Sequence, residues 1–121
     1  MEFITRNGRT VAMIDKSFKI DAAQTALDLM AEARYAGDYN CGAMVVYKES
    51  LTEAFFDLKT RFAGDVLQKF SNYRFKLAIV GDFSAYGSKA LRDFIYECNK
   101  GNLVFFKSSL EEALDALTCV R

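Results

Sequence analysis

Short apolar runs alternate along the chain with longer segments whose apolar residues recur every three or four positions. Residues 3–6 and 9–14 are two such runs, and the Asn7-Gly8 pair between them favours positive φ angles. This spacing predicts an antiparallel hairpin. Residues 43–47, 77–80 and 103–106 are three further runs. Residues 77–80 are apolar throughout, as expected of a parallel strand that is covered on both faces.

The segments between these runs show helical periodicity. Asp21 is placed to cap a first helix, which we expect to end near Gly37. Ser50 and Glu53 form a capping box that predicts a long second helical region, whose apolar stripe continues to Tyr73. Gly64 lies inside this stripe and indicates a bend or a close contact.

The last two helical segments carry their own signals. Ser88 can cap a third helix, which Gly101 ends at the C′ position. A fourth helix follows a second capping box, formed by Ser108 or Ser109 with Glu111 or Glu112. The order of elements predicts an α/β fold with a five-stranded mixed, mainly parallel sheet, an N-terminal hairpin and about four helices, in a single domain over residues 1–121.

Composition and charge narrow the function classes. The chain has 121 residues, 51% of them hydrophobic, so it can bury a core of its own. Its 16 basic and 16 acidic residues cancel and are scattered, which argues against nucleic-acid or anionic-membrane binding. The start of the chain has charged residues and no apolar segment long enough for a signal peptide or a membrane span, so we expect a cytoplasmic location.

Few residue types that carry catalysis are present. The absence of histidine excludes Ser-His and Cys-His nucleophiles and most catalytic zinc sites. Cys41, Cys98 and Cys119 lie far apart and form no CxxC pair, so we expect reduced thiols in place of a disulfide framework or a zinc site. From these observations we expect no cofactor, no metal and no enzymatic turnover.

Polar residues follow the predicted strands at their carboxyl ends, where ligands and partners of open parallel sheets tend to bind. Two interpretations of Gly81-Asp82-Phe83-Ser84 stay open: a ligand-contact turn, or a turn in which Asp82 or Ser84 caps backbone amides while Phe83 returns to the core. The charged residues of this edge are either acid–base groups or solvated surface. The residues expected at this edge are Asp15, Lys48, Glu49, Asp82, Ser84, Lys107 and Ser108.

The chain resembles a STAS domain, the sulfate-transporter and anti-sigma-factor-antagonist fold, over nearly its whole length. The features are the opening hairpin, the DAAQTALDLMAEA helix, the AMVVY strand, the FFD entry to the second helix, the LAIVG strand and the SLEEAL helix. The resemblance implies a module that docks on a protein, such as a kinase-like anti-sigma factor. It also implies a switch, in which a Ser that follows an Asp at the start of the second helix is phosphorylated.

Asp57 matches that Asp, whereas Leu58 and Lys59 stand where the family has its hydroxyl. Thr60 is the nearest hydroxyl, and Thr52 or Ser50 could replace it in another register. The resemblance therefore implies a contact surface around Asp57, Thr60 and Arg61.

Two long segments, EAFFDLKTRFAGDVLQKFSNYRFKLAIVGDFS and SKALRDFIYECNKGNLVFF, are also similar to a small bacterial family known as domain of unknown function 4180.

Three functional hypotheses follow. The first is a cytosolic, non-catalytic interaction or regulatory domain that binds a protein of unknown identity. The second is a small-molecule binder or enzyme that uses the crevice around Lys48, Asp82 and Ser84, and the third is a subunit whose main role is to form a homo-oligomer. A deep enclosed pocket at the strand ends would favour the second, and a shallow, partly apolar face would favour the first.

Overall fold

The computed structural model describes residues 1–36 and 41–119. Its five strands form one sheet in the order β1-β2-β3-β4-β5. β1 and β2 are antiparallel, and the remaining pairs are parallel. This arrangement confirms the predicted α/β fold class. The strands are β1 Glu2–Arg6, β2 Arg9–Met13, β3 Cys41–Tyr47, β4 Lys76–Val80 and β5 Val104–Lys107.

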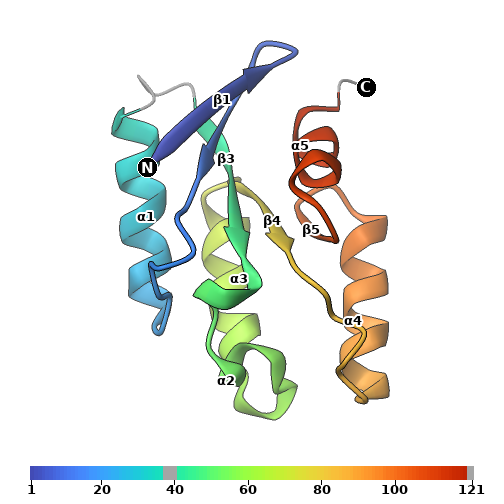
Figure 1. The fold of residues 1–121 in the computed structure, drawn as a ribbon. Helices are drawn as coiled ribbons and strands as arrows, with labels where there is room; N and C mark the ends of the chain where they lie inside the picture. Colours follow the sequence, from blue (N-terminus) through green and yellow to red (C-terminus); the bar gives the residue numbers. More distant parts are fainter. Residues whose placement is uncertain (37–40, 120–121) are drawn as a thin grey trace.

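The helices cover the two faces of the sheet unequally (Figure 1). One core gathers side chains from α1, α3 and α4 on one face, and a smaller core forms under α5 on the other. The helices are α1 Ala23–Ala36, α2 Glu53–Phe56, α3 Phe62–Asn72, α4 Lys89–Lys100 and α5 Leu110–Thr118, with 3₁₀ turns η1 Lys48–Ser50 and η2 Leu58–Thr60.

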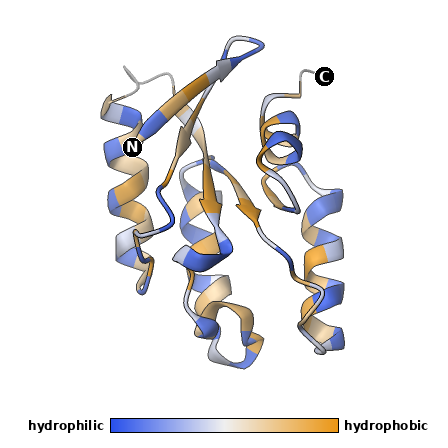
Figure 2. Cartoon of the chain, viewed as in Figure 1, coloured by the Kyte–Doolittle hydropathy of each residue, from blue (hydrophilic) through white to orange (hydrophobic). Residues whose placement is uncertain are grey.

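The central strands are apolar on both faces, which is why β3 and β4 appear almost uniformly hydrophobic in Figure 2. Met44 and Val46 of β3 face the larger core, while Ala43 and Val45 face the core under α5. Burial on both sides is the usual state of a parallel strand between helices, because the crossover connections place helices on the sheet.

The hairpin turn and two helix caps are confirmed. Asn7 and Gly8 have φ angles of 51° and 75°, as a two-residue hairpin loop requires. The Ser88 hydroxyl accepts a hydrogen bond from the Leu91 amide, and the Ser109 hydroxyl accepts one from the Glu112 amide. Ser109 is therefore the cap of α5.

Other predicted helix ends need correction. Ala22, not Asp21, directly precedes α1, and the Asp21 carboxylate accepts a hydrogen bond from the Thr25 hydroxyl instead. The predicted end near Gly37 lies outside the described residues. Gly101 does follow α4, but it occupies the C-cap with an extended backbone, at φ −84°, and not the left-handed C′ position.

The prediction of a capping box at Ser50 is wrong. Ser50 is fully buried, and its hydroxyl donates to the carbonyls of Asp15 and Lys16 at 3.3 and 3.4 Å. Its own carbonyl accepts from the Ile20 amide, beside a parallel bridge between Ile20 and Leu51. Ser50 is instead the last residue of η1, and α2 begins at Glu53 after Thr52, whose side chain makes no capping bond.

The expected long second helix is divided into α2, η2 and α3. The division falls between Asp57 and Arg61, where Arg61 takes a left-handed conformation with φ 63°. The Thr60 hydroxyl donates to the carbonyls of Ala54 and Asp57 at 2.6 and 2.8 Å, in addition to the backbone amides that these carbonyls already accept. Gly64 lies inside α3, with no atom near its absent side chain, so it marks neither a bend nor a close contact.

Candidate functional site

Lys48 is the centre of the polar residues at the carboxyl ends of β3 and β4. Its Nζ donates to the Asp82 carbonyl at 2.9 Å and lies 4.8 Å from the centre of the Tyr86 ring. A Cβ atom on Gly81 would lie 2.6 Å from the Lys48 Cβ, so only glycine fits beside the lysine. The aliphatic part of Lys48 thus fills the space between the two strand ends.

Asp82 and Ser84 form a self-contained turn. One carboxylate oxygen of Asp82 accepts from the Ser84 hydroxyl at 2.6 Å and from the Ser84 amide at 2.9 Å. These bonds, the hydroxyl above all, lower the pKa of Asp82 below its ordinary value, and nearby Lys48 lowers this pKa further. The geometry agrees with the second interpretation of this turn, in which Asp82 caps a backbone amide.

Phe83 turns back into the protein, as that interpretation requires. Its ring centre lies 5.3 Å from that of Phe106 and 6.0 Å from that of Phe56. Phe83 and Lys48 therefore occupy the strand-end region that was expected to form a crevice.

The same turn recurs at the end of β2. Asp15 accepts from the hydroxyl and the amide of Ser17 at 2.6 and 2.8 Å, and these bonds lower the pKa of Asp15. Lys16, inside this turn, lies 4.9 Å from the Tyr47 ring centre and 3.8 Å from the Glu49 carboxylate. The carboxylates of Asp15 and Asp82 are thus each engaged by a serine two residues later.

Lys107 does not join Lys48. Lys48 directly follows β3 and Lys107 is the last residue of β5. Lys107 lies near Phe105 on the α5 side of the sheet, with its Nζ 6.0 Å from the Phe105 ring centre. Tyr86, the aromatic partner of Lys48, packs against the core on the opposite face. The expected edge residues are therefore divided between the two faces.

Asp57, Thr60 and Arg61 lie together at the turn between α2 and α3, and all three are exposed. Asp57 accepts from the Lys59 amide at 3.1 Å and thereby caps η2. We call Asp57, Lys59, Thr60, Arg61 and Tyr86 the corner surface.

A groove of about 560 Å³ joins the two parts of the corner surface. The rings of Phe56 and Tyr86, which both line it, are stacked on each other, with centres 5.0 Å apart and planes 19° apart. Burial raises the pKa of Tyr86, with a smaller effect of Glu53. The groove residues are Glu53, Ala54, Phe56, Asp57, Leu58, Lys59, Tyr86, Ser88 and Ala90.

Sequence reasoning did not pair Phe56 with Tyr86. Phe56 belongs to the Phe-Phe-Asp segment and Tyr86 to the Ala-Tyr-Gly segment. The two residues are 30 positions apart, and no local sequence pattern connects them. The two segments meet because each follows a strand, and these strands, β3 and β4, are parallel neighbours in the sheet.

Two further grooves lie elsewhere. One, of about 640 Å³, runs beside α5 and is lined by Lys107, Phe105, Glu112 and Cys119 among others. The second, of about 390 Å³, lies between α1 and the end of α3, beside Arg34 and Tyr73. Within residues 1–36 and 41–119, no three His, Cys, Asp or Glu side chains are grouped so that they could hold a metal ion.

The cysteines are free thiols in separate places. Cys41 is buried and donates to the Ala43 carbonyl, and its burial raises the pKa of the thiol. Burial also raises the pKa of Cys98, with a further contribution from Glu97, while Cys119 is exposed. Raised pKa values make the first two thiols poor nucleophiles at neutral pH.

Residues 6–117 match the family model described as a domain of unknown function, DUF4180. The chain belongs to this family. Comparisons with curated proteins and with solved structures gave no match. None of the helices in the described part of the chain combines the length and the apolar character needed to cross a membrane.

Proposed function

We propose that this DUF4180 domain is a non-catalytic regulatory module that binds another protein through its corner surface. The observation that carries the proposal is the open groove between α2 and the loop that precedes α4, rimmed by exposed charged residues and floored by Phe56 and Tyr86. A stacked aromatic pair inside a charged rim is the common anatomy of a protein-binding surface.

The state of the strand ends supports a protein partner over a small-molecule ligand. A ligand site usually encloses most of its ligand in a preformed cavity with a few converging polar groups. Here Lys48 and Phe83 fill the region, and the Asp82 carboxylate is engaged by Ser84. This favours the open groove as the site of recognition.

The STAS resemblance supports the same surface. The N-terminal hairpin and the parallel strands that follow it agree with that family's pattern, and Asp57 caps η2, the turn that follows α2. A protein that docks there would contact Asp57, Thr60 and Arg61 together.

Thr60 provides a means of regulation at this surface. Its hydroxyl donates to two carbonyls and accepts from the Phe62 amide, so it holds the end of α2 to the start of α3. A phosphate on this oxygen would remove the donor proton and add up to about two negative charges. We expect phosphorylation to rearrange the corner surface and to weaken partner binding.

Affinity capture from the native cytosol, followed by mass spectrometry, tests the proposal. Arg61→Gly removes a side chain of the corner surface, and glycine tolerates the left-handed backbone at that position. Arg74→Gly is the matched control, because Arg74 is also exposed and left-handed, with φ 52°, but follows the far end of α3.

We expect Arg61→Gly, combined with Lys59→Ala, to lose a partner protein that the parent and Arg74→Gly both retain. If the combined variant keeps the partner while Ser84→Ala loses it, the contact belongs to the strand ends and the corner surface is the wrong site. If the parent captures a small molecule and no protein, the ligand-binding alternative replaces the proposal.

A further inference from the structure

The two edges of the sheet are treated differently. At the β5 edge, the side-chain amide of Asn99 from α4 pairs with Phe106: its Oδ1 accepts from the Phe106 amide at 2.8 Å, and its Nδ2 donates to the Phe106 carbonyl at 3.2 Å. Asn99 thereby replaces a neighbouring strand. An edge strand protected in this way is a poor template for another chain.

The β1 edge has no such protection among the described residues. In a two-residue hairpin the residues that flank the turn, Arg6 and Arg9, are a hydrogen-bonded pair, and the pairs alternate from there. Phe3 and Thr5 therefore direct their amide and carbonyl groups away from β2. No hydrogen bond from outside the hairpin reaches these groups within the described part of the chain.

Two copies of β1 placed antiparallel to each other are complementary in sequence. Glu-Phe-Ile-Thr-Arg, paired antiparallel with a second copy about Ile4, sets Glu2 opposite Arg6 of the partner subunit and Phe3 opposite the partner's Thr5. In this register the outward backbone groups of Phe3 and Thr5 meet those of the partner, as an antiparallel ladder requires.

We propose that β1 pairs with β1 of a second copy of this chain, so that a two-fold axis at Ile4 joins two sheets into one of ten strands. Registers displaced by two residues in either direction would also pair the outward groups, but they would not set Glu2 opposite the partner's Arg6. Opposite charges directly across two strands stabilise their pairing.

Side chains on both faces suit this contact. Phe3 and Ile4 are only half-buried, although each packs against one of the cores, so pairing would cover apolar surface on both sides. Arg6 donates to Glu111 and Asp115 through two of its five N–H groups, which leaves donors for the partner's Glu2.

The interface is small and distinct from the corner surface. Edge pairing of five-residue strands falls at the lower end of specific interfaces, below about 1,200 Å² of total buried area, so we expect association that depends on concentration. β1 contributes no residue to the groove between α2 and the loop that precedes α4. Dimerisation and partner binding can therefore succeed or fail separately.

Sedimentation velocity over a concentration series tests the association. The Thr5 amide faces away from β2, so Thr5→Pro removes a donor that the monomer does not use and places a ring in the interface. Thr5→Val keeps both the amide and the β-branched shape and serves as the control. We expect the parent and Thr5→Val to dimerise and Thr5→Pro to stay monomeric.

Cysteine cross-linking tests the register, and it decides the matter even if Thr5→Pro fails to fold. In the Cys119→Ser background, Ile4→Cys would place two thiols on the two-fold axis, with Cα atoms about 4.5 Å apart, a distance that permits a disulfide. With Thr5→Cys the thiols would be displaced by two residues, roughly 7 Å along the strands.

We expect mild oxidation to produce a covalent dimer of Ile4→Cys and not of Thr5→Cys. A parent chain that sediments as a monomer up to millimolar concentration would overturn the proposal. Preferential cross-linking of Thr5→Cys would overturn the register centred on Ile4.

Discussion

The contact between Gly81 and Lys48 shows how a single residue decides the shape of the strand ends. Gly81 sits where β4 ends, directly beside the Cβ of Lys48. The sequence marks Gly81 only as part of a turn signal, because the need for glycine comes from a residue 33 positions earlier. Sequence reasoning did recognise that Asp82 or Ser84 could serve as a local cap, since that chemistry involves neighbouring residues.

Gly81→Ala should destabilise the protein by about 1–3 kcal/mol, the usual cost of inserting a methyl group into occupied space. The obstacle is the Lys48 Cβ at 2.6 Å, which cannot move unless the backbone at the start of η1 moves with it. Urea unfolding measures this cost. Gly87→Ala is the control, since no atom lies within 4 Å of the added methyl group there. Equal unfolding midpoints for the two variants would contradict the steric account.

At the scale of secondary structure, the strands and two of the four expected caps were predictable from local pattern. The division of the second helical region was not. Phe55, Phe62, Val66 and Phe70 keep helical spacing across the break, and all pack against one core, so periodicity alone shows a continuous helix. The break is marked by the Asp57 cap of η2 and by the left-handed backbone at Arg61, which the apolar spacing does not reveal.

The pairing of Asn99 with β5 is also invisible in the sequence, and it yields a second prediction. Asn99→Leu should leave the Phe106 amide and carbonyl without partners in a half-buried place, at a cost of about 1–3 kcal/mol for each group that water cannot reach. Urea unfolding gives the cost. Asn102→Leu, an exposed position in the turn before β5, is the control and should change stability little.

Asn99→Leu should also expose a second free edge, because the N–H and C=O groups of β5 become available to another chain. Light scattering at high concentration would detect the resulting association. If the variant unfolds at the parent's urea concentration and scatters no more light, Asn99 has no role in protecting the edge.

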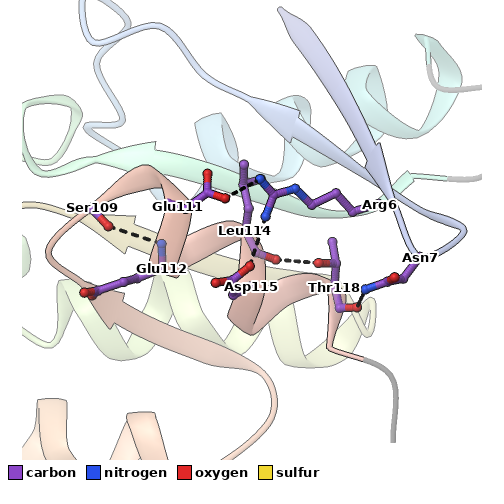
Figure 3. A network of polar contacts seen from close by, with 8 residues as sticks. All are labelled: Arg6, Asn7, Ser109, Glu111, Glu112, Leu114, Asp115 and Thr118. Atoms are coloured by element: carbon purple, nitrogen blue, oxygen red, sulfur yellow. Dashed lines mark hydrogen bonds and ion pairs between the residues drawn. The ribbon is translucent and has the colours of Figure 1, made fainter.

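At the scale of the whole molecule, contacts between the first strand and the last helix close the chain (Figure 3). Arg6 donates to Glu111 at 2.7 Å and to Asp115 at 3.0 Å, and the Asn7 side chain donates to the Thr118 carbonyl at 3.0 Å. The paired residues are 105 to 111 positions apart in the sequence. Neither the charge pattern nor the caps of α5 indicated them.

These contacts matter because α5 is the helix that covers the second core. Ala113, Leu114 and Leu117 bury the α5 face of the sheet, yet the helix has only nine residues, too few for stability of its own. Its position depends on packing and on its attachments to the hairpin. Loosening those attachments should therefore open α5 before it disturbs α1, which packs on the opposite face.

Arg6→Gln should accelerate amide hydrogen exchange in α5 and leave α1 unchanged, at a concentration low enough that the protein is monomeric. Gln carries no charge and cannot span both acids, so Glu111 and Asp115 lose their cation. Arg92→Gln, at an exposed position of α4, is the control and should not alter exchange in α5. Raising the ionic strength from about 0.01 to 1 M shortens the screening length from about 30 to 3 Å, which should reduce the difference between parent and variant. Exchange that rises equally in α1 and α5, or that is insensitive to salt, would show that Arg6 acts on the stability of the whole fold and not through its ion pairs with α5.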